Sequence, residues 1–530
     1  MTDRTLIRSV RIIDGTGSPW YRGDVLIDEG HISRIGTDFP REAADIVVEG
    51  ADRYLAPGFI DAHCHDDLIF LREPDRPEKA FQGVTSIVVG NCSFSLYPAV
   101  DTSRENLRRH FSGLLGHTED REIFDDLQSY RERLEGQGIA LNLVSLVGHA
   151  ALRLAILGHD RRHASESEIN TMCAMLDVQL SQGAAGLSLG LVYPPSAFAD
   201  MTEMVALAGV VRRHGKVLAA HIRAYEAGLL PAMEEFADIL RLSGAAGLLS
   251  HLQSAGRPNW GQIPVALDRL EAMRQEGVDI SFDMYPYPAG STWILQLLPP
   301  ATMDGGLEAL KKRLEDESFR ELLRRWVNQG GPEFDSQSKV SLIGWENVQL
   351  SAIGIDALKN FEGLDMQAAA ERVSVEPFDL MLRFILEDDG QTGIILFQLD
   401  EDDLKCACCH RLYMAGSDGL PRPGSRPHPR AFGTFPRIAG PLRRDRKWFG
   451  IEDAVRRMTS VAAQRFSLLD RGVVRPRMAA DLVLFSDDIA DRATFERSTE
   501  MATGISHLWV NGRAVVADGR LTGIRPGRVI

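Results

Sequence analysis

Two histidines, His63 and His65, stand one residue apart at the end of an apolar run in the stretch GFIDAHCHDD. Alternate residues of a β-strand project from the same face, so both imidazoles can face one ion while Cys64 points away. Neutral imidazole is the commonest metal ligand among protein side chains. By itself, the pair is equally compatible with two hydrogen-bonded core histidines.

Other potential ligands occur at the ends of further apolar runs. Cys92 follows VTSIVVGN, His221 ends KVLAAH, His251 ends GLLSH, and Asp418 ends LYMAGSD. Imidazole nitrogen and thiolate sulfur suit zinc, and a carboxylate can complete a catalytic site that keeps a position open for water. Packing alone would rarely produce the whole set. We therefore predict a zinc site formed by His63, His65, Cys92, His221, His251 and Asp418.

Two other features are interpreted as structural. The cluster CACCH at residues 406–410 is spaced too tightly for a zinc finger, whose ligand pairs are separated by about two to four residues. We expect Cys406, Cys408 and Cys409 to be thiols that precede the last strand. His149 ends the run IALNLVSLVGH but fits no necessary ligand position, so a hydrogen-bonded core role is favoured.

The predicted ligands need a scaffold that brings the ends of several strands together. Between about residues 54 and 418, eight strand-like runs alternate with amphipathic stretches such as IPVALDRLEAMRQEG. This alternation predicts a (β/α)8 barrel of the TIM type, whose catalytic face is formed by the carboxyl ends of the strands. A helical stretch at about residues 287–350 interrupts the rhythm and is predicted to be an inserted subdomain.

The two ends of the chain share a sequence pattern that differs from that of the middle. Residues 5–50 and the C-terminal region contain short apolar alternations, and Asn511-Gly512 and Asp518-Gly519 are typical hairpin turns. We expect both ends to form one small β-domain. The predicted limits are 1–55 and 466–530 for this domain and 56–465 for the barrel, including the insertion.

Composition restricts the cellular context and the partners. The chain has 530 residues and a net charge of −15, which argues against nucleic acid as the main partner. Its apolar runs are shorter than the roughly 20 residues of a membrane span, and its N-terminus has no secretory pattern. A cytoplasmic protein with reduced thiols is therefore expected. Composition leaves open whether it forms a homo-oligomer.

Several motifs, in order along nearly the whole chain, resemble the D-aminoacylase (N-acyl-D-amino-acid deacylase) family of the amidohydrolase superfamily. They include APGFIDAHCHDD, GVTSIVVGNCSFSLYP, GAAGLSLGLVYPPSAFADMTEM, FDMYPYPAGST and HPRAFGTFPRIAG. The resemblance implies a metal-bearing barrel, a β-sandwich built from both termini, and a small inserted domain. It also implies hydrolysis of a linear carbon–nitrogen amide bond in a small-molecule substrate.

The same resemblance implies how the metal is held. Many superfamily members bridge two metals with a carboxylated lysine from the fourth strand, but that strand here reads GLSLGL, with Ser188 and no lysine. A cysteine of the second strand takes over in this family, and Cys92 fits. The resemblance implies a tight zinc site at Cys92, His221 and His251. It also implies a second, weaker site at His63, His65 and Asp418.

Asp418 is the candidate general base in this interpretation. It would accept a proton from the attacking water and later deliver it to the leaving amine, while zinc supplies the Lewis acid. The alternative is that Asp418 only binds metal or orients a ligand histidine.

Substrate recognition departs from the family pattern. The family places a lysine two residues after the sixth-strand histidine, whereas this chain has Gln253, which carries no charge. An N-acyl-D-amino acid therefore competes with a neutral, cyclic or aryl amide as the substrate, and a non-catalytic scaffold is the third hypothesis. The predicted substrate-binding residues are Tyr193, Gln253, Tyr285, Ser291, Arg223 and Arg430. The alternative for the two arginines is a structural role in ion pairs. An aromatic pocket or core could include Phe81, Phe94, Trp293 and Trp326.

Overall fold

A computed structural model describes residues 4–530, and its centre is a closed barrel of eight parallel strands. The strands are β6 (Phe59–Asp61), β7 (Val84–Val89), β8 (Asn142–Gly148), β9 (Gly186–Gly190), β10 (Val217–His221), β11 (Ala246–Leu249), β12 (Ile280–Met284) and β16 (Tyr413–Ala415). The last strand meets the first where Ala62 N donates a hydrogen bond to Ala415 O at 3.1 Å. Each strand overlaps one of the eight predicted runs, so the predicted fold class is confirmed.

Amphipathic helices cover the barrel. They include α4 (Leu127–Gln137), α6 (Glu166–Ser181), α7 (Met201–Arg213), α8 (Leu229–Ser243), α9 (Ile263–Gln275), α15 (Glu401–Cys409) and α17 (Ile451–Met458). Helix α7 shows why such segments fold locally: Asp200 caps its N-terminus by accepting a hydrogen bond from Glu203 N. Met204, Leu207 and Val211 follow at helical spacing and are buried, which attaches the helix to the strands.

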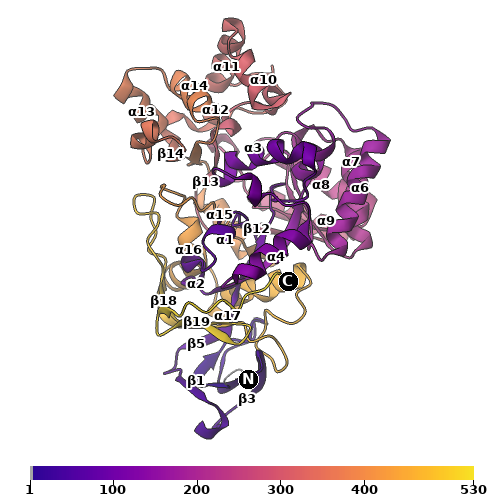
Figure 1. Cartoon of the computed structure of the whole chain (residues 1–530). Coiled ribbons are helices and arrows are strands. Elements are labelled where there is room, and N and C mark those ends of the chain that lie inside the picture. The colour runs from indigo at the N-terminus through magenta and orange to yellow at the C-terminus, as the bar shows by residue number, and fades with distance from the viewer. Residues whose placement is uncertain (1–3) are drawn as a thin grey trace.

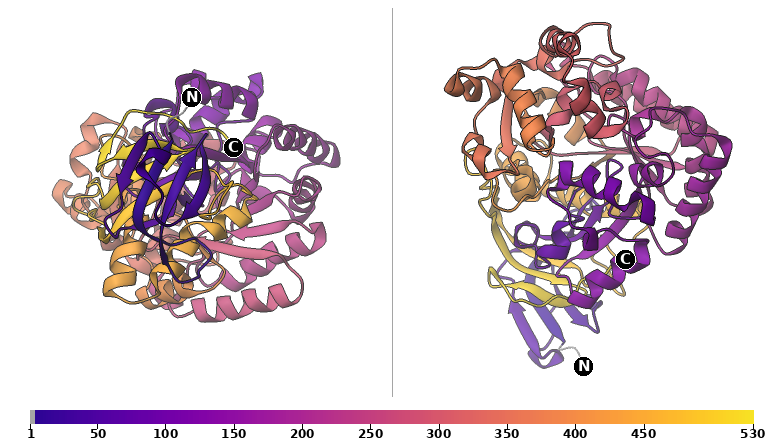
Figure 2. Two further views of the ribbon diagram at one scale, coloured as in Figure 1. Left: turned by 90° about the horizontal axis from the view of Figure 1, so that it is seen from below. Right: turned by 45° about the horizontal axis from the view of Figure 1, so that its top comes forward.

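Both termini contribute to one β-sandwich at the end of the molecule away from the barrel mouth (Figures 1 and 2). Its strands are β1 (Thr5–Ile12), β2 (Tyr21–Asp28), β3 (His31–Gly36), β4 (Ile46–Glu49), β5 (Tyr54–Pro57), β17 (Leu482–Ala490), β18 (Thr503–Val510), β19 (Arg513–Ala517) and β20 (Arg520–Leu521). Antiparallel pairing of β5 with β17 joins the two parts. Ile7, Val25 and Trp509 are buried in its separate core.

The predicted turn at Asn511-Gly512 lies between β18 and β19, and both residues have positive φ, 48° and 77°. Positive φ at both central positions is what a tight hairpin of the type I′ class requires. The Asn-Gly pair therefore correctly predicts the backbone conformation of this hairpin.

The segment between β12 and β16 forms a subdomain that lies over the barrel mouth, at the opposite end from the β-sandwich (Figure 1). It contains the antiparallel strands β13 (Gly290–Trp293), β14 (Val348–Ala352) and β15 (Gly393–Leu396). Its helices are α10 (Gly306–Arg313), α11 (Glu317–Gln329), α12 (Lys339–Ile343), α13 (Met366–Val373) and α14 (Pro377–Glu387).

This inserted region differs from the sequence expectation in two ways. Its elements continue past residue 350, and it includes a three-stranded sheet as well as helices. The strands were missed because they are only four or five residues long and are separated by up to 55 sequence positions, from Trp293 to Val348. The predicted domain limits themselves stay a prediction. No helix within residues 4–530 is both long and apolar enough to cross a membrane.

Candidate metal centre and active site

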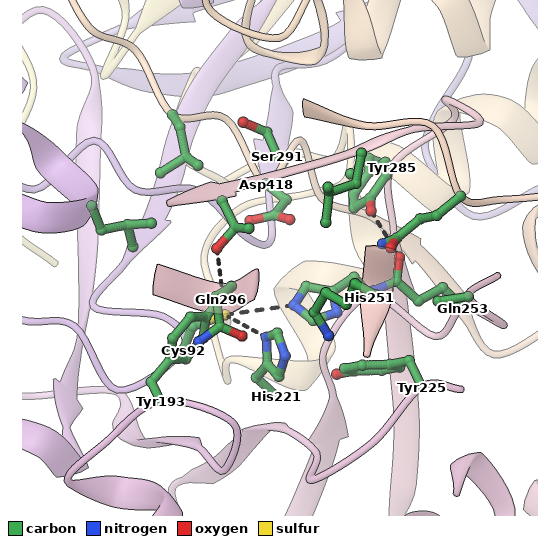
Figure 3. A pocket seen from close by; sticks show the side chains of 18 of the residues that line it. Cys92, Tyr193, His221, Tyr225, His251, Gln253, Tyr285, Ser291, Gln296 and Asp418 are labelled. Atoms are coloured by element: carbon green, nitrogen blue, oxygen red, sulfur yellow. Dashed lines mark hydrogen bonds between the residues drawn. The ribbon is translucent and has the colours of Figure 1, made fainter. Parts of the chain in front are cut away.

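Three of the predicted ligands converge at the carboxyl ends of β7, β10 and β11. The sulfur of Cys92 lies 3.6 Å from Nδ1 of His221 and 3.6 Å from Nε2 of His251. Figure 3 shows these three side chains pointing toward one another. A zinc ion at about 2.3 Å from sulfur and about 2.0–2.1 Å from nitrogen, with tetrahedral angles, requires S···N separations of about 3.5 Å. The residues therefore fit zinc without rearrangement.

The backbone at these positions is unusual. Cys92, His251 and Asp418 all have positive φ values, of 52°, 37° and 46°. Such values are uncommon for residues other than glycine and cluster at functional sites, where the surrounding structure holds them. Here they occur where three strands end and the chain turns, which directs the side chains toward the barrel axis. Asp418 N donates to His63 O at 2.7 Å, and His251 N donates to Asp283 Oδ1 at 3.0 Å, which fixes two of these turns.

A second group lies beside the first. Asp418 Oδ1 is 3.1 Å from Nε2 of His65 and 3.5 Å from Nε2 of His63. The sulfur of Cys92 is 3.4 Å from the same nitrogen of His63, so Cys92 belongs to both groups. On its other side, His63 Nδ1 lies 3.3 Å from a carboxylate oxygen of Asp283. A carboxylate partner of this kind fixes the ring orientation and tautomer of a ligand histidine.

Electrostatics favour the metal-binding forms of three of these groups, Cys92, Asp418 and His221. At His63 and His65, burial would lower the pKa, but Asp283 raises the pKa of His63 well above its ordinary value and a hydrogen bond to Asp418 raises that of His65 to about 9. Burial alone would raise the pKa of the Cys92 thiol, but His63 and hydrogen bonds to the neighbouring histidines hold it well below its ordinary value. Burial would likewise raise the pKa of Asp418, yet Arg430 and His63 hold it well below its usual range. Burial lowers the pKa of His221 to about 4. Thiolate, carboxylate and neutral imidazole are the forms that bind a metal ion.

Four of the predicted substrate-binding residues line the pocket that opens above this centre. They are Tyr193, Gln253, Tyr285 and Ser291. The hydroxyl of Tyr285 donates to Oε1 of Gln253 at 2.8 Å, as Figure 3 shows. The hydroxyl of Tyr193 is 3.4 Å from Thr292 Oγ1 on β13, so the inserted subdomain helps to close the pocket.

The two predicted arginines are placed differently. Arg430 is fully buried behind the pocket: its Nη2 lies 2.9 Å from Asp418 Oδ2, and its guanidinium stacks 4.3 Å from the centre of the Tyr285 ring. Arg223 does not reach the metal centre. It forms an ion pair with Glu235 at 3.0 Å and donates to backbone carbonyls after β9, which corresponds to the structural role weighed for it.

The remaining predicted features are aromatic and histidine side chains that pack in the core, some of them near the metal centre. Phe94 contacts the rings of Tyr193 and Trp293 near the metal centre, at 5.2 and 6.0 Å between centroids. Phe81 and Trp326 lie away from it. The core interpretation of His149 is confirmed, because the side chain is buried and its Nε2 is 2.7 Å from Glu203 Oε1.

The CACCH cysteines lie on or beside α15. None belongs to a group of potential metal ligands within the described residues.

Sequence reasoning missed several residues that shape the site. Asp283 was assigned no role from the sequence, although it stands near the end of the apolar run DISFDMY, whose strand pairs with the strand that leads to His251. Glu226 and Lys339 also line the pocket, and they form an ion pair of 2.8 Å. No local pattern identifies them, because Lys339 comes from α12 of the inserted subdomain, 113 positions away from Glu226.

Comparison with known proteins agrees with this geometry. Residues 411–516 match the model of an amidohydrolase family. An N-acyl-D-glutamate deacylase of Alcaligenes xylosoxydans xylosoxydans is 34% identical over 98% of this chain and 94% of its own length. A D-aminoacylase of the same organism is 32% identical over 99% and 97%. The chain belongs to the D-aminoacylase family of amidohydrolases.

A solved structure extends the likeness to three dimensions. The N-acyl-D-glutamate deacylase of Bordetella bronchiseptica, in complex with zinc and a phosphonate inhibitor that mimics the tetrahedral intermediate, superposes with a TM-score of 0.84. It is 33% identical, and the alignment covers 100% of this chain and 99% of that one. Membership of this family makes the protein a metal-dependent hydrolase of carbon–nitrogen amide bonds. The enzyme class predicted from the sequence is therefore confirmed, and a non-catalytic scaffold is not supported.

Proposed function

We propose that the enzyme is a zinc-dependent deacylase of N-acyl-D-amino acids. The observation that carries this proposal is the convergence of Cys92, His221 and His251 beside Asp418, in a chain whose relatives bear these names. Cys92, His221 and His251 form the tighter zinc site. His63, His65 and Asp418 form a weaker second site, which shares its surroundings with the first. The pocket over both receives the part of a small-molecule substrate that carries the scissile amide.

Bound zinc supplies Lewis acidity, which polarises an amide carbonyl and acidifies water. The chain supplies the proton transfer through Asp418. Its Oδ2 is held by Arg430 at 2.9 Å, and its low pKa keeps it ionised at neutral pH, so it can accept a proton from water. The same carboxyl then returns the proton to the leaving amine. His63 is oriented by Asp283 and keeps the Asp418 carboxylate in place.

The substrate carboxylate is recognised by Arg430 together with Tyr285. Arg430 Nε and Nη1 have no hydrogen-bond partner within residues 4–530, although the side chain is fully buried. A buried guanidinium with unpaired donors is costly unless a ligand completes it. Gln253 accepts from Tyr285 and leaves its own amide NH2 free of hydrogen bonds within the described residues, so it can donate to the same ligand carboxylate.

Substitution of Asp418 by asparagine tests the mechanism. Asp418→Asn keeps the shape of the side chain but removes the proton acceptor, so kcat should fall by about 10²–10⁴-fold. Zinc content, measured by elemental analysis, should stay close to that of the wild type because the tighter site is intact. An unchanged kcat would exclude Asp418 as the base.

A neutral or cyclic amide is the second candidate substrate. The observation that favours it is that both nearby cations are already paired: Lys339, the one lysine or arginine lining the inner pocket in the described chain, with Glu226, and Arg430, behind the pocket, with Asp418. The zinc-loaded enzyme should be assayed with N-acetyl-D-amino acids, their L-enantiomers, hydantoin and an aryl amide. Turnover of the neutral compounds alone would replace the first candidate by the second. Gln253→Lys, which adds a cation, should then create activity toward the N-acyl-D-amino acids.

A further inference from the structure

The pocket above the metal ligands is small, and a larger cavity adjoins it. The inner pocket measures about 50 Å³ and the outer cavity about 770 Å³. Glu226, Gln296 and Lys339 line both, so the two spaces are neighbours separated by these three side chains. Pockets that hold a whole small molecule commonly measure about 300–1,000 Å³. The inner pocket alone is below this range, and part of a substrate must extend beyond it.

The neck between the two spaces is held by contacts across the subdomain boundary. Lys339 Nζ, at the first residue of α12, lies 2.8 Å from Glu226 Oε1, in the loop after β10. Nearby, Ala227 N donates to Oε1 of Gln337 at 3.0 Å. Because lysine and glutamate neutralise each other, the neck presents the hydrocarbon part of Lys339 without a net charge. An uncharged chain can pass such a neck at little electrostatic cost.

The outer cavity has the lining of a site for an apolar group. Its walls include Val192, Leu298, Trp326 and Phe334, and the rings of Trp326 and Phe334 meet edge to face at 5.6 Å. Trp326 is 2% exposed, and its indole N–H has no partner within residues 4–530. Ser336 Oγ in the same lining also has no partner within residues 4–530, and the charged lining residues include Arg223 and Glu235, which form an ion pair with each other. Mostly apolar walls with a few polar groups are typical of a pocket for an aliphatic or aromatic group.

The strand order indicates which end of the substrate enters the cavity. The carboxylate-binding side chains proposed above, Tyr285 and Arg430, follow β12 and β16. The barrel residues of the outer cavity follow β9 and β10, on the other side of β11 and its ligand His251. The two halves of an amide leave the scissile bond in different directions. With the amino-acid half held near β12 and β16, the acyl half is directed toward β9 and β10.

We propose that the outer cavity is a second substrate subsite, which receives a large apolar acyl group. This inference rests on the proposed N-acyl-D-amino-acid deacylase function and deepens it by naming the acyl class. The enzyme then prefers medium-chain or arylacetyl substituents to acetyl. The inserted subdomain supplies Leu298, Trp326 and Phe334, and thereby sets this preference.

Turnover of two substrates that differ only in the acyl group tests the subsite. The zinc-loaded wild type should have a kcat/KM for the N-hexanoyl derivative of a D-amino acid at least tenfold above that for the N-acetyl derivative. Phe334→Asp places a carboxylate in the half-buried outer wall and should reduce this ratio by tenfold or more. Phe334→Leu keeps an apolar side chain at this position, so its ratio should stay close to that of the wild type. Leu386→Asp, at an exposed position on α14 of the same subdomain, is the control and should leave the ratio unchanged.

Calorimetric binding of the two N-acyl compounds, to wild type and Phe334→Asp, separates failure of the subsite from failure of the function. If N-acetyl turnover occurs but the two acyl groups give equal kcat/KM, or Phe334→Asp lowers both equally, the subsite is refuted while the function stands. If neither compound is hydrolysed, the proposed function fails. Tighter binding of the hexanoyl compound that Phe334→Asp abolishes would still support the cavity as an acyl site, and equal binding would refute it.

Discussion

The barrel mouth and the inserted subdomain lie face to face across the pocket, yet they obtain their residues in different ways. The mouth takes its metal-binding groups from strand ends, where a backbone turn directs each side chain inward, as at Cys92 and His251. The subdomain contributes pocket walls from helices and short strands, as at Lys339 and Trp326. This difference indicates that the barrel determines the chemistry, whereas the insertion determines which substrate reaches it.

Loss of the thiolate should have the largest effect, because Cys92 lies within both groups of potential ligands. Cys92→Ala should weaken zinc binding by more than about 100-fold, since even outer partners of metal ligands contribute about 10–100-fold. Turnover should be lost in parallel. Zinc affinity from competition with a chelator, together with kcat, provides the measurement.

The matched control is Cys173→Ala on α6, whose half-buried thiol lies outside both groups. It should bind zinc as the wild type does. If Cys92→Ala retains zinc and activity, the metal does not depend on the ligand after the second barrel strand. The contrast drawn above, in which strand ends supply the chemistry and the insertion selects the substrate, would then be wrong.

Loss of an ion pair should destabilise the folded protein more in the barrel than in the insertion. Lys79, on α2 (Pro77–Ala80) of the barrel, is fully buried, and its Nζ contacts Asp61 Oδ2 at 2.6 Å and Ser417 Oγ at 2.9 Å. Burial would lower the pKa of Lys79, but Asp61 and Asp66 raise it above its ordinary value, so the group is charged. Lys79→Met leaves buried carboxylates unpaired and should lower the free energy of unfolding by about 3–5 kcal/mol in urea titrations.

The corresponding change in the insertion is Lys311→Met. Lys311 pairs with Asp389, but the aspartate side chain is 61% exposed. Solvent screens such a pair, so the free energy of unfolding should change by about 0–1 kcal/mol. Equal losses of unfolding free energy in the two variants would mean that the buried pair of Lys79 and Asp61 stabilises the protein no more than the exposed pair of Lys311 and Asp389.

The same contrast explains what could be predicted from the sequence. Strand ends such as His63 and His251 follow apolar runs, so local pattern and the geometry of a barrel suffice to bring them together. Lys339 and Glu226 have no such relation, because their contact depends on how the insertion folds back over the mouth. Gln253 was identified only through the family pattern, and the structure then supplied its partner, Tyr285. The ion pair of Arg223 with Glu235 could not be predicted from the sequence, because it depends on the position of α8.

A smaller effect than that of Lys79→Met is expected at the contact between the two regions. His110, on α3 (Arg104–Leu115), stacks on Phe94 of the barrel at 4.7 Å and meets the edge of Trp293 of the insertion. Burial lowers the pKa of His110 to about 3. Between this value and about 6.5, the unfolded chain binds a proton that the folded chain does not, so acidification destabilises the folded state. The free energy of unfolding should fall by about 2 kcal/mol between pH 7 and pH 5 from this group alone.

His110→Phe keeps an aromatic ring at the contact and removes the titrating group, so it should lose about 2 kcal/mol less than the wild type over the same interval. Urea unfolding at pH 7, 6 and 5 measures the difference between the two proteins. Phe111→Leu, at the neighbouring position, changes packing without changing a titratable group, and its effect should be independent of pH. If His110→Phe and the wild type show parallel pH profiles, the imidazole binds a proton as readily in the folded chain as in the unfolded chain. The contact between barrel and insertion would then be open to water at this point, contrary to the burial of His110 among Phe94, Phe111 and Trp293.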